Sequence, residues 1–439
     1  MSQPELRAEL ARQLRTAQAE QRLPSVAASV FRRGEIVWQD ALGLADVEAG
    51  RITSPETQYR IGSITKTFTA VLVLQLRDAG ELSLDDRLTD HIPESAHAPT
   101  LGRMLAHASG LQREPPGEIW ESLRAPSREE LVAGMAAAEQ LLAPGSWWHY
   151  SNLAFALLGE VVARKTCGSW EDALRERVLE PLSLERTTSE PAEPAACGYF
   201  VDPYSDAVRA ERDVDFGGSG ALGKLWSTVG DLATWGSFLV SGEDGVLASA
   251  TLEEMSHVRT MVDHDGWTLA WGRGLELYRS REHLFVGHGG SMPGHLAALV
   301  ASRKTGIGAA VLTNTSAGGR PEQLALDLAR AAIEQLPAEQ EPWLPADPAP
   351  PELAPLLGRW WTEGHELVFS WRQGRLEGRL VDGTPGRDTS VFEPEGGDRF
   401  RCVEGRERGE VLRLVRAENG DVEKMYFATY PLTRTPSTF

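Results

Sequence analysis

The alternation of apolar and polar positions near the N-terminus predicts a helix followed by a β-hairpin. Leu6, Leu10 and Leu14 recur at the spacing of one helix face, and Pro24 ends this pattern. Within residues 25–46, apolar and polar positions alternate on both sides of an Arg-Gly turn. We therefore expect an amphipathic helix that covers the first strands of a sheet.

Further along the chain, the apolar pattern changes between helical and extended periods. A strong helical pattern runs from residue 63 to 78 and is ended by Gly80. Shorter helical patterns cover residues 127–142, 151–165, 169–180 and 324–336, and two apolar strands joined by a turn cover 295–314. This order predicts one α/β (α+β) domain over residues 1–336, with a sheet built from both ends of that stretch.

The remaining residues differ from the first 336 in composition and in period. Residues 337–355 are rich in proline and acidic side chains, which predicts a semi-rigid linker. Residues 356–439 alternate with a period of two between glycine turns, and Asn419-Gly420 marks a hairpin. We expect a small antiparallel β-barrel or sandwich there.

Composition narrows the possible partners. The 439 residues carry 44 basic and 63 acidic side chains, a net charge of -19, which disfavours nucleic acid and anionic membranes. No apolar run is long enough to span a membrane, and the N-terminus lacks the features of a secretory signal. The cysteines at 167, 197 and 402 are too few and too scattered for a disulfide framework or a zinc site. We expect a cytoplasmic protein without a metal or cofactor, because metal motifs and phosphate-binding glycine loops are also missing.

Ser63 and Lys66 form the first candidate catalytic element. They lie three residues apart at the start of the predicted helix, so their side chains share one helix face. A serine hydroxyl needs a base to become a nucleophile, and a buried lysine with a lowered pKa can be that base. The helix N-terminus places free N–H groups where an acyl oxyanion develops. Taken alone, this spacing is common and favours a helix-capping serine beside a surface lysine.

Two later motifs support a catalytic interpretation. Tyr150-Ser151-Asn152 begins an apolar helix, where a phenol can share the serine proton and Asn152 can hold a substrate amide. The segment 287–295 reads GHGGSMPGH, and glycines beside His288 allow a substrate backbone to approach a strand closely. A buried tyrosine beside a helix cap and an ordinary glycine-rich turn are the structural alternatives.

The order S-x-x-K, Y-x-N, H-G-G resembles the serine β-lactamase and penicillin-binding-protein superfamily, and its class C β-lactamase-like branch in particular. The segments YRIGSITKTFTA, LSLDDRLTDHIP, MLAHASGL and PGSWWHYSN are similar to further motifs of that family. The resemblance covers about residues 20–335 and implies a central antiparallel sheet flanked by helices. The C-terminal segment resembles the lipocalin-like domain that several such hydrolases carry.

The resemblance implies roles for individual residues. Ser63 is the acylated nucleophile, Lys66 its base or proton relay, and Tyr150 the second proton-transfer group. Asn152 contacts a substrate amide, and His288 replaces the lysine of the Lys-Thr-Gly motif that binds the substrate carboxylate in true β-lactamases. Because a histidine is mostly neutral, this replacement disfavours efficient β-lactam hydrolysis.

The same resemblance places an oxyanion hole at the backbone N–H groups of Ser63 and Ser291. Substrate contacts are expected at Asn152, Gly289 and Gly290 and in a broad apolar pocket formed by Trp147, Trp148 and Trp226. A literal Lys-Thr-Gly at 304–306 lies in the turn between the two predicted strands of 295–314. We therefore interpret it as unrelated to the family's third motif.

Three functions fit this pattern. The leading hypothesis is a stand-alone penicillin-binding-protein-type thioesterase that releases and cyclises a nonribosomal peptide, with a carrier-protein-bound peptidyl thioester as its substrate. A cytosolic esterase or D-aminopeptidase, with water as the acceptor, is the alternative. A non-catalytic binding or scaffold protein is the third, although the serine, lysine and tyrosine that catalysis needs are all present. The substrate in each case is a small molecule or a peptide.

Overall fold

The protein consists of two compact units, Met1–Ala338 and Glu339–Phe439. The computed structural model describes residues 3–243, 245–336, 342–383 and 388–436. Residues 337–341 of the predicted linker lie outside the described residues, and residues 342–350 have neither helix nor strand.

A nine-stranded antiparallel sheet forms the centre of the first unit. In spatial order its strands are β3 (Arg51–Ile52), β2 (Glu35–Asp46), β1 (Ser25–Arg32), β13 (Ile307–Thr313), β12 (His295–Ala301), β11 (His283–Met292), β10 (Glu276–Ser280), β9 (Leu269–Trp271) and β8 (Thr260–Met261). β1 pairs directly with β13, which confirms that both ends of this unit build one sheet. Every residue of β13 is buried, which explains why this strand is a continuous apolar run.

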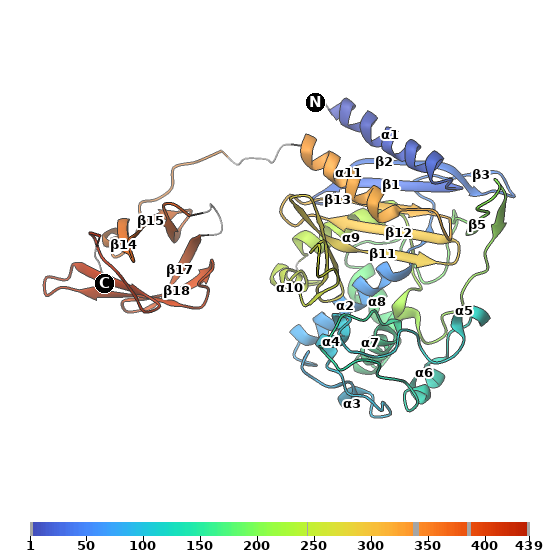
Figure 1. The fold of residues 1–439 in the computed structure, drawn as a ribbon, viewed down its shortest axis with the longest axis horizontal. Coiled ribbons are helices and arrows are strands. Elements are labelled where there is room, and N and C mark those ends of the chain that lie inside the picture. Colours follow the sequence, from blue (N-terminus) through green and yellow to red (C-terminus); the bar gives the residue numbers. More distant parts are fainter. Residues whose placement is uncertain (1–2, 244, 337–341, 384–387, 437–439) are drawn as a thin grey trace. The chain divides into compact units, whose positions relative to one another are not determined.

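Two amphipathic helices, α1 (Gln3–Glu20) and α11 (Pro321–Gln335), lie side by side on one face of the sheet (Figure 1). The leucine stripe predicted from the sequence, Leu6, Leu10 and Leu14, is buried there as expected. These leucines pack with apolar residues of α11 and of the outer face of β1, so this face is a structural core.

The opposite face of the sheet is covered by α9 (Val229–Ser241) and by α2 (Thr65–Asp78). Phe68 of α2 stacks on Trp235 of α9 with ring centroids 3.8 Å apart, and Trp235 Nε1 donates to Thr67 Oγ1 at 2.8 Å. The start of α2 is therefore held firmly against α9, which itself packs on the sheet.

The remaining helices form a cap beyond α2. They are α3 (Leu88–His91), α4 (Leu101–Leu105), α5 (Ile119–Ser122), α6 (Arg128–Gly134), α7 (Asn152–Lys165), α8 (Trp170–Leu174) and α10 (Ser249–Met255), with 3₁₀ turns at Gly62–Ile64 and Gly220–Leu222 and a π turn at Arg175–Leu179. The helix predicted over 127–142 ends early at Gly134, because Leu141 N and Leu142 N both donate to Gly110 O instead. The helix predicted from residue 63 begins with the 3₁₀ turn and becomes α-helical at Thr65.

Two short strand pairs lie outside the large sheet: β4 (Tyr59–Arg60) with β7 (Trp226–Ser227), and β5 (Tyr199–Val201) with β6 (Val208–Ala210). The first pair braces the segment that enters the nucleophile turn, because β4 ends three residues before Ser63. The pairing extends one residue further, because Ile61 N donates to Leu225 O at 2.9 Å.

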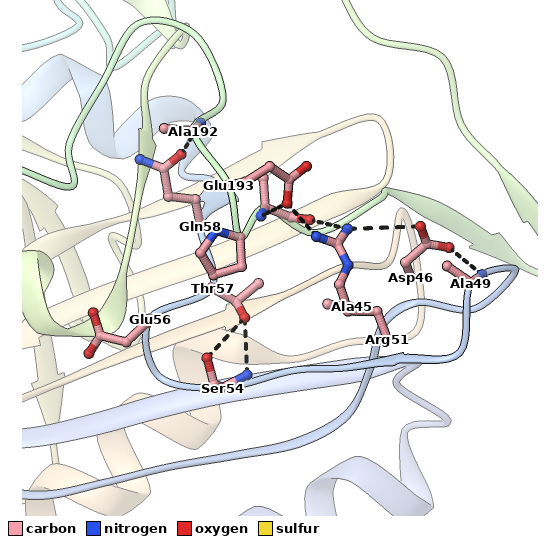
Figure 2. A network of polar contacts seen from close by, with 12 residues as sticks. Ala45, Asp46, Ala49, Arg51, Ser54, Glu56, Thr57, Gln58, Ala192 and Glu193 are labelled. Atoms are coloured by element: carbon pink, nitrogen blue, oxygen red, sulfur yellow. Dashed lines mark hydrogen bonds and ion pairs between the residues drawn. The ribbon is translucent and has the colours of Figure 1, made fainter.

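A polar network fixes the chain just before β4. Figure 2 shows the Arg51 guanidinium between the carboxylates of Asp46 and Glu193. Gln58, which directly precedes β4, accepts a hydrogen bond from Ala192 N at 2.6 Å. The network joins the edge strand β3 to the loop around residue 193, so the chain is held on both sides as it approaches residue 63.

The second unit is an eight-stranded antiparallel sheet in sequence order. Its strands are β14 (Gly358–Thr362), β15 (His365–Arg372), β16 (Arg375–Leu380), β17 (Thr389–Gly396), β18 (Arg399–Glu404), β19 (Val411–Arg416), β20 (Val422–Phe427) and β21 (Tyr430–Leu432), preceded by a 3₁₀ turn at Ala354–Leu356. Trp361 and Thr433 exchange two backbone hydrogen bonds of 2.9 and 3.0 Å, which nearly closes the sheet into a barrel. The predicted small barrel is confirmed, while its likeness to lipocalins stays a prediction.

Candidate active site

Ser63 and Lys66 lie together at the turn that leads into α2. Lys66 is completely buried, and its Nζ donates to Ser63 Oγ at 3.0 Å and to Leu222 O at 2.6 Å. Burial lowers the pKa of Lys66 to about 7. A substantial fraction of this lysine is therefore an uncharged amine near neutral pH, able to take the serine proton.

Tyr150 lies on the other side of the same pair, directly before α7. The Lys66 ammonium lies 5.0 Å from the Tyr150 ring centroid. Burial raises the pKa of Tyr150, and a hydrogen bond with the Ser63 side chain opposes that rise. The phenol is thus protonated at rest and placed to pass a proton to or from the serine oxygen.

His107 positions the tyrosine, a role that the sequence analysis did not assign. Its ring stacks on Tyr150 with centroids 4.1 Å apart, and its Nδ1 accepts a hydrogen bond from Ser151 N at 3.0 Å. Burial, followed by the nearby Lys66, lowers the pKa of His107 well below its usual range. The segment MLAHASGL, noticed as a family motif, was the available signal.

His288 lies on β11, at the third corner of the site, and is only 1% exposed. The 2.5 Å contact between its Nδ1 and Gly289 O indicates that Nδ1 carries the proton and donates to this carbonyl. Burial, then the charge of Lys66, lowers the pKa of His288 to about 3. The ring is therefore a neutral imidazole, and its Nε2 has no hydrogen-bond partner among the described residues.

Glycines bring β11 against the nucleophile turn. A Cβ at Gly290 would lie 2.1 Å from Ile61 O, and one at Gly62 would lie 2.8 Å from Ser291 N. Gly62 also has a φ of +50°, which other residues adopt at a cost. The backbones of Ser63 and Ser291 therefore run close to each other, as the predicted oxyanion hole requires.

Asn152 lies at the start of α7 and faces a carboxylate that the sequence analysis did not identify. Its Nδ2 donates to both oxygens of Glu114, at 2.9 and 3.0 Å. Its Oδ1 is buried and has no partner in the described part of the chain. Asn152 is thus fixed through its amide nitrogen, with Glu114 as a second polar group next to it.

These residues line a cavity of about 740 Å³. It contains Ser63, Tyr150, Asn152, His288, Gly289, Gly290 and Ser291, together with five glutamates, Glu114, Glu121, Glu211, Glu276 and Glu322, and one arginine, Arg113. The structure therefore brings these predicted residues of the three motifs around one cavity, which is lined by more carboxylates than basic groups.

The predicted tryptophan contacts are placed differently. Trp226 is 3% exposed and packs between Arg60 and His295, because β7 directs it into the core. Trp147 is 61% exposed beside His264, and Trp148 lies behind Tyr150. None of these three lines the cavity. Its wall instead includes a tryptophan at position 120.

The literal Lys-Thr-Gly at 304–306 lies in the turn between β12 and β13, as predicted. It is absent from the residues that line the cavity. In the described ranges, no group of three or more His, Cys, Asp or Glu side chains is arranged to hold a metal ion. Among the same residues, no helix is long and apolar enough to cross a membrane.

Comparisons with known proteins agree with this geometry. A family profile described as Beta-lactamase matches residues 10–334, and one described as Domain of unknown function (DUF7586) matches residues 349–434. Penicillin-binding protein 4 of Amycolatopsis lactamdurans is 29% identical over 79% of this chain and 95% of its own length. Esterase EstB of Burkholderia gladioli is 36% identical over 43% of this chain and 52% of its own length. The structure of a D-stereospecific amidohydrolase from Streptomyces sp. aligns at 26% identity with a TM-score of 0.64, over 74% of this chain and 98% of that one.

Proposed function

Because the chain belongs to the Beta-lactamase family, we propose that Ser63 forms an acyl-enzyme with an ester, thioester or amide carbonyl of a peptide-like substrate. The observation that carries this proposal is the 3.0 Å hydrogen bond between Ser63 Oγ and the fully buried Lys66 Nζ. A lysine whose pKa is lowered to about 7 by burial serves as a base more readily than a solvated one.

The acylation step follows from the positions of these groups. Neutral Lys66 takes the Ser63 proton as Oγ attacks the carbonyl carbon, and the carbonyl oxygen becomes an oxyanion between the N–H groups of Ser63 and Ser291. When the tetrahedral intermediate collapses, the leaving group departs with a proton delivered by Tyr150, which Lys66 can replace. Water or an amine then attacks the acyl-enzyme by the reverse sequence.

His288 affects which acyl groups the site accepts. A histidine whose pKa is lowered to about 3 stays neutral and gives a substrate carboxylate no ion pair. The ion pair that a lysine makes with the carboxylate of a penicillin has no counterpart at His288. This favours esters, thioesters and D-configured peptides or amides over β-lactams as substrates.

Two specific activities remain as candidates. The leading one is a thioesterase that releases a carrier-bound peptidyl thioester and cyclises it through the peptide's own amine. The alternative is an esterase or D-aminopeptidase that uses water, and the resemblance to EstB and to the D-stereospecific amidohydrolase favours it. A scaffold without catalysis is disfavoured by the intact contact between Ser63 and Lys66.

A linear peptidyl thioester with a D-residue at its C-terminus and a free N-terminal amine tests both activities. Mass spectrometry distinguishes a cyclic product, lighter than the acid by one water, from the acid alone. Acid alone rejects the cyclase and favours the hydrolase. The Ser63→Ala variant must lose both products and its labelling by a fluorophosphonate probe, and turnover that survives this change rejects Ser63 as the nucleophile.

A further inference from the structure

Two carboxylates approach the same residue of the third-motif strand, Gly289, from different elements. Glu276, the first residue of β10, accepts a hydrogen bond from Gly289 N at 3.2 Å. A Cβ at Gly289 would lie only 2.5 Å from Glu322 Oε1, which comes from the first turn of α11. The absence of a side chain at Gly289 is thus what admits Glu322 to the cavity wall.

Two other carboxylates of the cavity have side-chain partners in the protein. Glu114 lies 3.4 Å from the guanidinium of Arg113, and Glu211 accepts a hydrogen bond from Ser316 Oγ at 2.7 Å. The two carboxylates beside Gly289 have no arginine or lysine within ion-pair distance in the described ranges. They therefore form an acidic pair without an ion-paired arginine or lysine, and both line the cavity. Lys66 acts on Glu276 only from beyond ion-pair distance.

Burial makes this pair costly to ionise. It raises the pKa of Glu276 to about 8, with a further rise from the charge of Glu322, and it also raises the pKa of Glu322. On the same wall, the buried His288 offers Nε2 as an acceptor without a partner among the described residues. This wall thus presents several acceptors and lacks a matching cation, which a bound ligand can supply.

We propose that Glu276 and Glu322 form a subsite for a primary ammonium group of the substrate. This inference rests on the proposed function and names its substrate class. Gly289 and Ser291 are two residues apart on one strand, so the subsite lies about 7 Å from the predicted oxyanion N–H. The ammonium is therefore separated from the reacting carbonyl by about the length of a lysine side chain. It belongs either to the acyl donor or to an amine acceptor that carries a second amine.

The donor arm of the test compares N-acetyl-D-lysine and N-acetyl-D-norleucine, each as its N-acetylcysteamine thioester. These donors differ mainly in the terminal ammonium. We expect the wild-type protein to prefer the lysyl donor by about 10- to 100-fold in kcat/KM, the range of a hydrogen-bonded charge pair. Glu276→Gln and Glu322→Gln should each reduce this preference, measured as the ratio of the two kcat/KM values in the same variant, towards one.

The acceptor arm uses the norleucyl thioester with pentane-1,5-diamine or pentylamine as the acceptor, and measures amide against acid. A preference for the diamine that is lost in the same two variants assigns the subsite to the acceptor. Glu282→Gln is the matched control, because Glu282 lies at the opposite end of the β10–β11 hairpin and its side chain is 73% exposed. Thermal unfolding of each variant shows whether it folds.

Two results separate this inference from the proposed function. If Ser63-dependent turnover shows no preference for an ammonium in either arm, the subsite is rejected while the acyl-enzyme stands. If turnover does not depend on Ser63, the proposed function itself is rejected. A preference that persists unchanged in both folded Gln variants also overturns the subsite.

Discussion

Replacing the buried lysine, Lys66→Met, should abolish activity and at the same time stabilise the protein at neutral pH. Lys66 is fully buried, and burial lowers its pKa from 10.5 to about 7. Between these two values the unfolded chain binds a proton that the folded protein does not, so stability rises as pH rises from 7 to 10.5. Methionine has a similar length and needs no proton, so its variant lacks this dependence.

The size of the effect follows from the shift. With these two pKa values, protonation of Lys66 in the unfolded state disfavours folding by about 4 kcal/mol at pH 7 and by about 1 kcal/mol at pH 10. The hydrogen bonds of Lys66 to Ser63 and Leu222 are lost in the variant at every pH. The difference in unfolding free energy, variant minus wild type, should therefore shrink by about 3 kcal/mol between pH 7 and pH 10.

Urea unfolding of the full chain at pH 7, 8.5 and 10 measures this difference directly. Groups that titrate equally in both proteins cancel in the comparison. Lys224→Met is the control for removal of a lysine as such, since Lys224 forms an ion pair with Glu190 at 3.0 Å. Hydrolysis of a p-nitrophenyl ester should fall by at least about 100-fold in Lys66→Met. A stability difference that is independent of pH would refute a buried lysine with a lowered pKa.

Three further predictions test the site and the core. In the wild-type protein, kcat/KM for an ester should rise as pH increases through about 7, because only uncharged Lys66 accepts the serine proton. A flat profile between pH 5.5 and 9 contradicts this role. Gly290→Ala should lower ester kcat/KM by about 100-fold, because its Cβ would lie 2.1 Å from Ile61 O and force the oxyanion N–H groups apart. Gly230→Ala should not, because its Cβ would meet only Thr228 Oγ1, at an ordinary contact distance of 3.7 Å. Phe68→Ala should lower the free energy of unfolding by about 3–5 kcal/mol in urea titrations, because Phe68 is fully buried in the core.

Local spacing made much of this serine hydrolase of the β-lactamase fold predictable from sequence. Ser63 and Lys66 are three residues apart, so a helical backbone alone brings their side chains to one face. The leucines of α1 lie where their period predicts, and the strands of residues 25–46 pair around the expected Arg-Gly turn. In each case a short stretch of chain determines the geometry, and the period of its apolar positions reports it.

The walls of the cavity were not predictable in this way. Glu114, Glu211, Glu276 and Glu322 come from four separate parts of the chain, and no local pattern marks any of them. Trp226 was expected in the cavity, but the pairing of β7 with β4 turns it into the core. The direction of a side chain in a loop or short strand depends on tertiary partners that a single sequence does not display.

The third motif shows how the sequence and the structure combine. From the sequence, His288 in place of a lysine indicates only the loss of a positive charge. The structure shows that two carboxylates, Glu276 and Glu322, flank the neighbouring Gly289 and lack a basic partner among the described residues. This wall therefore offers two carboxyl groups, which a substrate ammonium can hold in the ionised form, in place of the positive charge that binds a carboxylate. Ser63 and Lys66 come from the turn and helix before this wall rather than from the wall itself, so the proposed selection by an amine leaves the residues of the family's acyl-enzyme chemistry in place.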